Sequence, residues 1–163
     1  MFHRKTQMLL LSTLILLLAA CAIPAAEPAP TIDEVEVYAA VIRQVYTVDH
    51  TFGEPPNFPN IYLLDTHVAD EATADAIVAA LADLPAQFTW VTSADEAPRD
   101  AHDIVIDGAV INFGPIQPQD DGTLHVDAGI YFAPLGAGGQ TYVLENVDGV
   151  WTIIGDTGVR WMS

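Results

Sequence analysis

The stretch LHVDAGIYF, residues 124–132, decides the fold, because Leu, Val, Ala, Ile and Phe alternate in it with His, Asp, Gly and Tyr. Alternation with a period of two turns every second side chain to the same face, which predicts a half-buried strand. An Asp-Gly pair stands before this run at 121–122, and a second pair at 148–149 separates the strand-like runs 140–147 and 150–154. Such a pair favours a tight hairpin, since the turn needs the positive φ that glycine tolerates. The C-terminal half is therefore predicted to be an antiparallel meander of about four or more strands.

The N-terminal half carries the spacing of helices instead. Apolar side chains recur three and four positions apart in residues 35–45, and Thr31 with Glu34 matches a capping box before them. A second helix is expected to follow Asp70, which can cap it. Helices first and strands later predict a single α+β domain over residues 31–163, with the N-terminal helices packed on the C-terminal sheet.

The glycine-rich residues 136–139 lie between two of the predicted strands and open no helix. A dinucleotide-binding loop needs a helix directly after its glycines, so this segment is predicted to be a turn. The layout resembles the helix-plus-curved-sheet arrangement of cystatin-like and NTF2-like folds. This likeness is one of architecture, and no motif places the domain in a named family.

The first 20 residues are typical of an export signal. A short basic segment, residues 3–5, precedes an apolar run over residues 8–20. As a helix this run would span about 20 Å, which is short of the roughly 30 Å of a bilayer's hydrocarbon core and favours a cleaved signal over a membrane anchor. The run ends in Leu18-Ala-Ala-Cys21, which resembles the lipobox of bacterial lipoproteins.

The lipobox resemblance implies cleavage before Cys21 and a lipid on its thiol. The chain would then be anchored to the cell membrane or outer membrane, facing the periplasm or the exterior. The alternative is an ordinary secretory signal that happens to end in cysteine. Residues 21–30 include three prolines, which favour an extended tether between the lipidated cysteine and the domain.

The charge of the chain is strongly negative, with 22 acidic residues against five basic ones and a net charge of −17. Removal of residues 1–20 leaves three arginines and no lysine against all 22 acids, a balance of −19. Binding to nucleic acid is excluded on this ground, since phosphate contacts depend on Lys and Arg. A basic exported protein or a divalent cation such as calcium could be attracted, or the acidity could reflect habitat alone.

Metal ligation is a weak candidate chemistry. Four histidines have an aspartate within two positions: Asp49–His50, Asp65–His67, His102–Asp103 and His125–Asp127. Residues two apart on a strand point the same way, so His125 and Asp127 would share a face, as would Asp65 and His67 if their strand extends that far. No H-E-x-x-H motif and no calcium-binding loop accompanies them. The predicted metal ligands are Asp65, His67, His125 and Asp127. The alternative is that they are solvent-facing polar positions. No specific cofactor is expected.

Aromatic residues offer the second candidate site. Five aromatic residues are expected on one sheet, whose concave face could form a small apolar pocket against the first helix: Trp90, Trp151, Trp161, Tyr131 and Tyr142. Of these, Trp90, Trp151, Tyr131 and Tyr142 are the predicted binding residues. The alternative is that these rings form the core of the domain. The region after Cys21 holds no lysine, and no serine in the glycine-flanked elbow of the serine hydrolases.

The sequence thus predicts a lipid-anchored envelope protein that acts as a non-catalytic binding or structural module. Two alternatives stay open. One is an inhibitor or immunity-type lipoprotein that binds a basic exported protein by charge complementarity. The other is a metal-dependent envelope hydrolase that uses His/Asp pairs.

Overall fold

The computed structural model describes residues 31–50, 58–64, 67–68 and 70–163 of the chain. The predicted signal, the tether and Cys21 lie outside the described residues, and so does Asp65. The helices are α2 Glu34–Thr47, α3 Glu71–Ala80 and the short 3-10 helix η2 Ala94–Glu96. The strands are β1 Asn60–Leu64, β2 Gln87–Val91, β3 Gly108–Phe113, β4 Gln117–Pro118, β5 Leu124–Ala133, β6 Gly136–Val147 and β7 Val150–Met162.

All strands belong to one sheet, in the order β2-β1-β3-β5-β6-β7, with β4 paired to β5. Strands β5, β6 and β7 are antiparallel neighbours, so the predicted C-terminal meander is confirmed. The sheet as a whole is mixed, because β1 pairs in parallel with both β2 and β3. Helix α3 connects β1 to β2, and a crossover of this kind is what brings two successive strands into parallel alignment.

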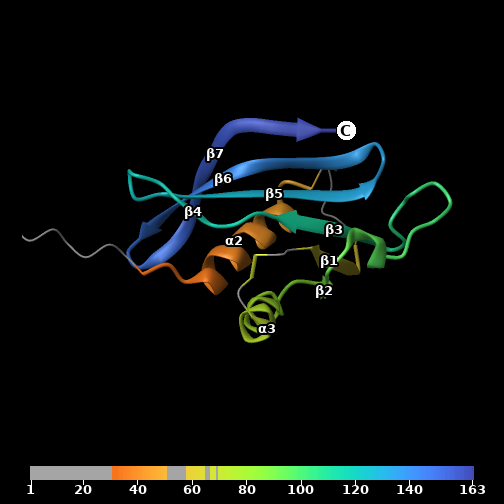
Figure 1. The fold of residues 1–163 in the computed structure, drawn as a ribbon, viewed down its shortest axis with the longest axis horizontal. Coiled ribbons are helices and arrows are strands. Elements are labelled where there is room, and N and C mark those ends of the chain that lie inside the picture. The colour runs from red at the N-terminus through yellow and green to blue at the C-terminus, as the bar shows by residue number, and fades with distance from the viewer. Residues whose placement is uncertain (1–30, 51–57, 65–66, 69) are drawn as a thin grey trace, which may run out of the picture.

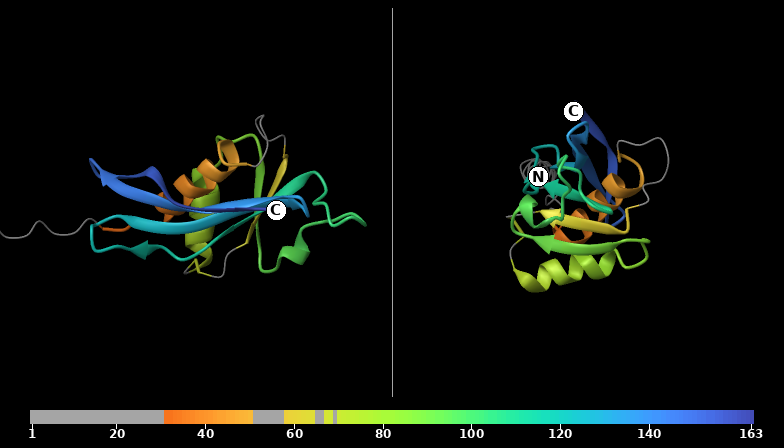
Figure 2. Two further views of the ribbon diagram at one scale, coloured as in Figure 1. Left: turned by 90° about the horizontal axis from the view of Figure 1, so that it is seen from above. Right: turned by 90° about the vertical axis from the view of Figure 1, so that its right-hand side faces the viewer.

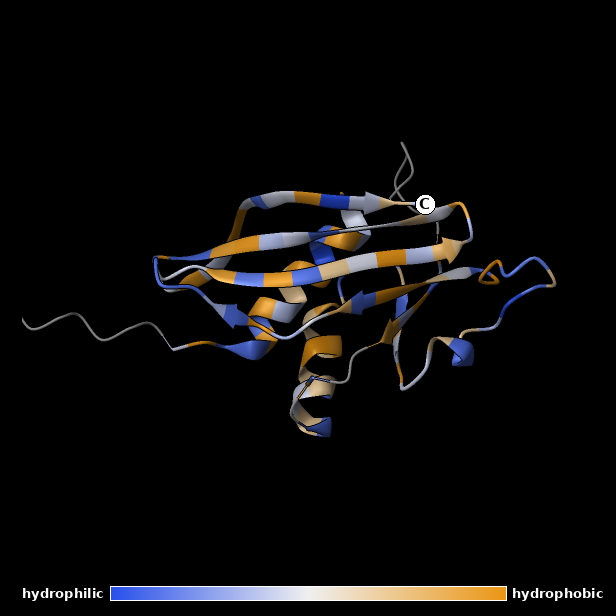
Figure 3. Ribbon diagram, turned by 45° about the horizontal axis from the view of Figure 1, so that its top comes forward, coloured by the Kyte–Doolittle hydropathy of each residue, from blue (hydrophilic) through white to orange (hydrophobic). Residues whose placement is uncertain are grey.

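Both α-helices pack on the same face of the sheet, as Figure 1 and Figure 2 show, which confirms the α+β prediction. Helix α2 contacts β5 and β7, while α3 contacts α2 and β2. We call this helix-covered side the inner face and the opposite side the outer face. Along β5, Leu124, Val126, Ala128 and Ile130 are buried in the inner-face core. Figure 3 shows the resulting alternation as bands of colour along the long strands.

Helix α2 begins two residues later than the capping box predicts. Its N-cap is Asp33, whose Oδ1 accepts a hydrogen bond from Glu36 N at 3.1 Å, so the Thr31 cap is wrong. Aspartate and threonine both cap helices well, so residue type alone does not decide between two such sites so close together. The second cap is confirmed, because Asp70 Oδ1 accepts from Thr73 N at 2.8 Å.

The glycines at 136–139 form the start of β6, so the turn predicted for them is wrong. The chain reverses just before them, between the end of β5 at Ala133 and Gly136. Aromatic rings explain the glycines, because a Cβ on Gly136 would lie 2.0 Å from the Phe132 ring and one on Gly139 would lie 2.7 Å from Trp161 Nε1. Glycine is needed here because aromatic rings lie close against the backbone, which is a common reason for glycine inside a strand.

Candidate functional site

A cavity of about 480 Å³ lies between the C-terminal end of α2 and the inner face of β5, β6 and β7. Its helix side is formed by Val45 and by Asp49 and His50, which directly follow the helix. Gln140, Tyr142 and Arg160 stand on the strand side. Its volume falls within the range of about 300–1,000 Å³ that is usual for small-molecule sites.

Asp49 is the hub of the polar groups in the cavity. Its Oδ2 accepts hydrogen bonds from Gln44 Nε2 and Gln140 Nε2 at 3.1 Å each, and from Tyr142 Oη at 3.0 Å. These donors come from α2 and from β6, so the carboxylate ties the helix end to the sheet. The other carboxylate oxygen, Oδ1, accepts no hydrogen bond from the part of the chain that the structure describes.

His50 stands beside Asp49 in the cavity wall and is only 7 % exposed. Its Nδ1 is buried and has no hydrogen-bond partner among the described residues. A buried polar atom without a partner costs about 1–3 kcal/mol of stability. A residue that lines the cavity therefore contains an unsatisfied polar atom.

Tyr142 is 2 % exposed, and its ring belongs to the core while its hydroxyl reaches Asp49. Burial raises the pKa of this hydroxyl far above its usual value, and the charge of Asp49 and the hydrogen bond to it raise the pKa further. The tyrosine is therefore a proton donor to Asp49 throughout the physiological pH range.

Arg160 is the one basic residue that lines the cavity within the described chain, and it is already paired. Its Nη2 lies 2.5 Å from Asp156 Oδ2, and the hydrogen bond from Arg160 holds the pKa of Asp156 below its usual range. Arg160 and Asp156 together carry no net charge, so Asp49 sets the formal charge at the cavity.

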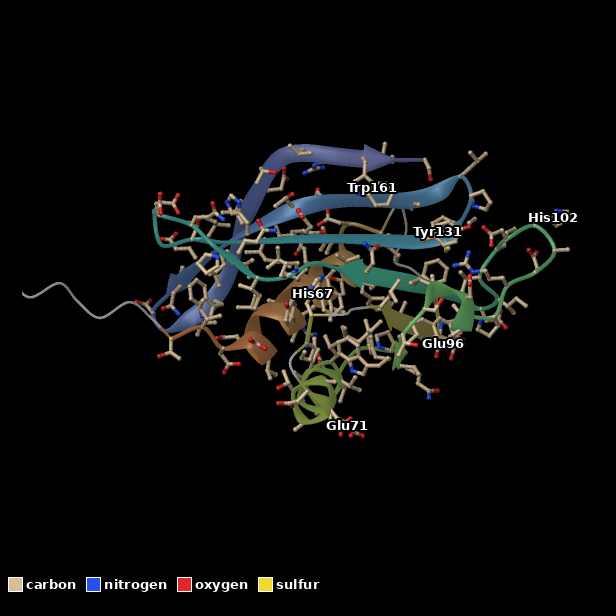
Figure 4. All side chains as sticks on the ribbon, in the orientation of Figure 1. His67, Glu71, Glu96, His102, Tyr131 and Trp161 are labelled. Atoms are coloured by element: carbon tan, nitrogen blue, oxygen red, sulfur yellow. The ribbon has the colours of Figure 1, made fainter. Side chains whose placement is uncertain are left out.

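Trp161 also lines the cavity, and it packs on glycines of the two neighbouring strands. Gly129 pairs with Gly139, and Gly139 pairs with Trp161, so the three positions form a row across β5, β6 and β7. A Cβ on Gly129 would lie 2.9 Å from Trp161 Cζ2, so the indole lies across both glycines. Gly129 alternates with the inner-face residues Ala128 and Ile130, so the indole meets these glycines from the outer side of the sheet. Figure 4 labels Trp161 on β7.

The predicted metal ligands do not gather at this cavity. His125 and Asp127 share the outer face of β5, where Thr141 Oγ1 donates a hydrogen bond to Asp127. His67 is an exposed residue between β1 and α3 (Figure 4). Within the described ranges no three His, Cys, Asp or Glu side chains form a group that could hold a metal ion.

The four predicted binding aromatics divide among four places. Tyr142 lines the cavity, and Trp151 is buried in the core at 3 % exposure. Trp90 is half-buried, and its Nε1 donates to Ala74 O of α3 at 3.0 Å. Tyr131 lies on the outer face. The cavity wall therefore contains one of these four rings, together with Trp161, which was also expected on this sheet.

Tyr131 belongs to a separate polar group on the outer face. Its hydroxyl donates to Asp103 Oδ2 at 2.7 Å, and Arg99 Nη1 donates to Asp103 Oδ1 at 2.7 Å. The Arg99 guanidinium also lies 4.8 Å from the centre of the Tyr131 ring. This outer cluster packs beside a small apolar group of Ala97, Val105 and Val110.

Sequence reasoning noted Asp49 next to His50 but gave this pair no more weight than the other three. Two facts about the fold set it apart, namely the end of α2 at Thr47 and the position of β6 opposite it. Arg160 was missed because β7 continues to Met162, well past the run at 150–154. A positive φ of 80° at Gly158 interrupts the alternation that would have revealed this continuation.

Comparison with known proteins found no family model, no curated protein and no solved structure that matches the chain.

Proposed function

We propose that the chain is an exported, lipid-anchored module of the cell envelope that binds a small ligand in the cavity at the end of α2. The observation that carries the binding role is the cavity itself, whose wall contains the buried and unpartnered Nδ1 of His50. A pocket of ordinary ligand size with a few convergent polar groups is the default binding site of a domain. The export and anchoring rest on the lipobox-like segment that ends at Cys21.

The anchor is tested by metabolic labelling with a fatty acid in the native host. The wild-type chain is expected to take up the label, and Cys21→Ala is expected to lose it. Stable attachment needs two or more acyl chains, because a single chain binds a membrane only marginally. Persistent labelling of the variant would contradict the proposal. Within the described residues the structure contains no helix with the length and apolarity to cross a membrane.

The binding role is tested by native mass spectrometry of the full chain extracted gently from its host. We expect a bound small molecule on the wild-type protein and its loss from His50→Phe, which fills the polar wall with an apolar ring. His102→Phe is the matched control, because His102 lies in an exposed loop far from the cavity (Figure 4). Identical ligand-free spectra for the wild type and both variants would contradict a binding role.

A second candidate function is binding of a basic exported protein. It is favoured by the net charge of −17, most of which is carried by acids without a basic partner, since the described residues contain three ion pairs. Attraction of this kind weakens steeply as salt screens the charges. Capture of a basic protein by the full chain that is lost at high salt would favour this function.

A further inference from the structure

The cavity presents a hydrogen-bond acceptor that nothing in the described chain satisfies. Asp49 Oδ2 is saturated by three donors, whereas Oδ1 of the same carboxylate has none. His50 lies beside it, and its Nδ1 is buried without a hydrogen-bond partner among the described residues. The two side chains are neighbours in sequence and line the same cavity.

The electrostatic surroundings of Asp49 favour a positively charged ligand. Helix α2 ends at Thr47, two residues before Asp49, and its last turn contains no basic residue. The negative end of the helix dipole is therefore uncompensated at the wall that also carries the Asp49 carboxylate. The strong net negative charge of the chain acts in the same direction.

The opposite wall does not reverse this preference. Arg160 lies 2.5 Å from Asp156 on the same strand, so a carboxylate offsets its charge, and it also interacts electrostatically with Asp49. Gln140 and Tyr142 use their polar groups on Asp49, and the rest of the lining is glycine backbone, Trp161 and the apolar side chains of Val45, Ala128 and Met162. A ligand for this cavity therefore needs a cationic donor at one end and a short apolar body at the other.

We infer that the cavity binds a small organic cation, a primary ammonium whose N–H groups donate to Asp49 Oδ1 beside His50. An ammonium has three donors and no acceptor, so it supplies the donor that this oxygen lacks. Its apolar body lies against Val45, Ala128 and Met162. This inference rests on the proposed binding function and names the chemical class of the ligand.

The test is titration calorimetry of the full chain in detergent micelles with three probes of one size: n-butylammonium, n-butanol and n-butyrate. We expect n-butylammonium to bind at least about tenfold more tightly than n-butanol, since a hydrogen bond to a charged group is worth that factor or more. We expect n-butyrate not to bind. Asp49→Asn should weaken n-butylammonium binding by about tenfold or more, whereas Asp103→Asn, at the outer cluster, should leave it unchanged.

The outcomes separate this inference from the proposed function. Equal binding of n-butanol, or tighter binding of n-butyrate, would overturn the cation and leave the cavity as a binding site. No binding of any probe would also overturn the cation, while the native mass spectra would still decide whether the cavity is occupied. If Asp49→Asn fails to fold, the ranking of the three probes on the wild-type chain decides the matter.

Discussion

The domain contains two clusters of the same three residue types, one on each face of the sheet. On the inner face Tyr142 donates to Asp49, and Arg160 lines the cavity on the same strand side as Tyr142. The outer cluster joins Tyr131 and Arg99 to Asp103. In the outer cluster both carboxylate oxygens have a donor, whereas in the inner cluster one oxygen has three donors and the other has none.

This difference indicates separate roles for chemically similar groups. In the outer cluster both oxygens of Asp103 are bonded and the buried Arg99 Nε has no partner among the described residues, and the cluster fastens the loop that contains Arg99 and Asp103 to β5. Beside the inner cluster the buried atom without a partner is His50 Nδ1, and it belongs to a residue that lines a cavity. Buried polar groups are nearly always satisfied in folded proteins, so an unsatisfied group next to a cavity indicates a binding site. Residue identity alone does not distinguish the two clusters, but the burial of the tyrosine and the adjoining cavity do.

The largest expected contrast comes from removing one hydroxyl from each cluster. Tyr142→Phe should lower the free energy of unfolding by about 1.5–3 kcal/mol, because a buried hydrogen bond to a charged group is lost. Tyr131→Phe should cost less than about 1 kcal/mol, since its partner Asp103 is solvent-exposed and water replaces the bond. Urea unfolding of both variants measures the difference. Equal costs would show that the two clusters do not differ in burial as described.

Alkaline pH offers a second, smaller contrast. Burial raises the pKa of Tyr142 above its usual value of 10.0, so the folded chain keeps this proton while the unfolded chain releases it. The resulting stability is present below about pH 10 and is lost as the pH rises beyond it. Tyr142→Phe should therefore lose less stability than the wild type in alkaline solution, as followed by circular dichroism across the pH range.

The control for this measurement is Tyr131, whose pKa is also raised, chiefly by its hydrogen bond to Asp103. Because its side chain is open to solvent, Tyr131→Phe should change the alkaline transition less than Tyr142→Phe does. A larger effect of Tyr131→Phe would contradict the burial assigned to Tyr142.

The smallest effect is expected at acid pH in the outer cluster. Hydrogen bonds from Tyr131 and then Arg99 lower the pKa of Asp103 below its usual 3.8. A lowered carboxyl pKa contributes stability that is present above about pH 4 and is lost as the pH falls through the folded-state value. Asp103→Asn should therefore make the unfolding midpoint in urea fall less steeply between neutral and acid pH. A slope equal to that of the wild type would show that Asp103 is not held in its charged form.

Much of the fold could be predicted from the sequence, because alternation and turn chemistry are local. The run at 124–132 and the Asp148-Gly149 turn indicate the C-terminal strands correctly, and positive φ values of 54° and 90° at that turn give the reason. The parallel pairing of β1 with β2 and β3 was not predicted, since it depends on which strands meet after the crossover through α3. The glycines at 136–139 were misassigned because the Phe132 and Trp161 rings that need them are only visible in three dimensions.

The candidate site could be predicted only in part. Tyr142 was among the predicted binding residues, and a pocket against the first helix was expected on the concave sheet. The Asp49–His50 pair was visible, but the two other pairs that share a strand face were preferred as metal ligands, because burial and missing partners are properties of the fold. An acidic chain brings aspartate next to histidine often, so spacing alone carries little information here.

The central claim is that the inner cluster is an open binding site for a cation at Asp49, beside the ring of His50. Heteronuclear NMR of the histidine side chains during titration with n-butylammonium tests it directly. The claim predicts that the ring nitrogens of His50 shift as the cavity fills, while those of His102 and His125 stay in place. Unchanged His50 resonances at saturating n-butylammonium, or equal shifts in all three rings, would contradict it.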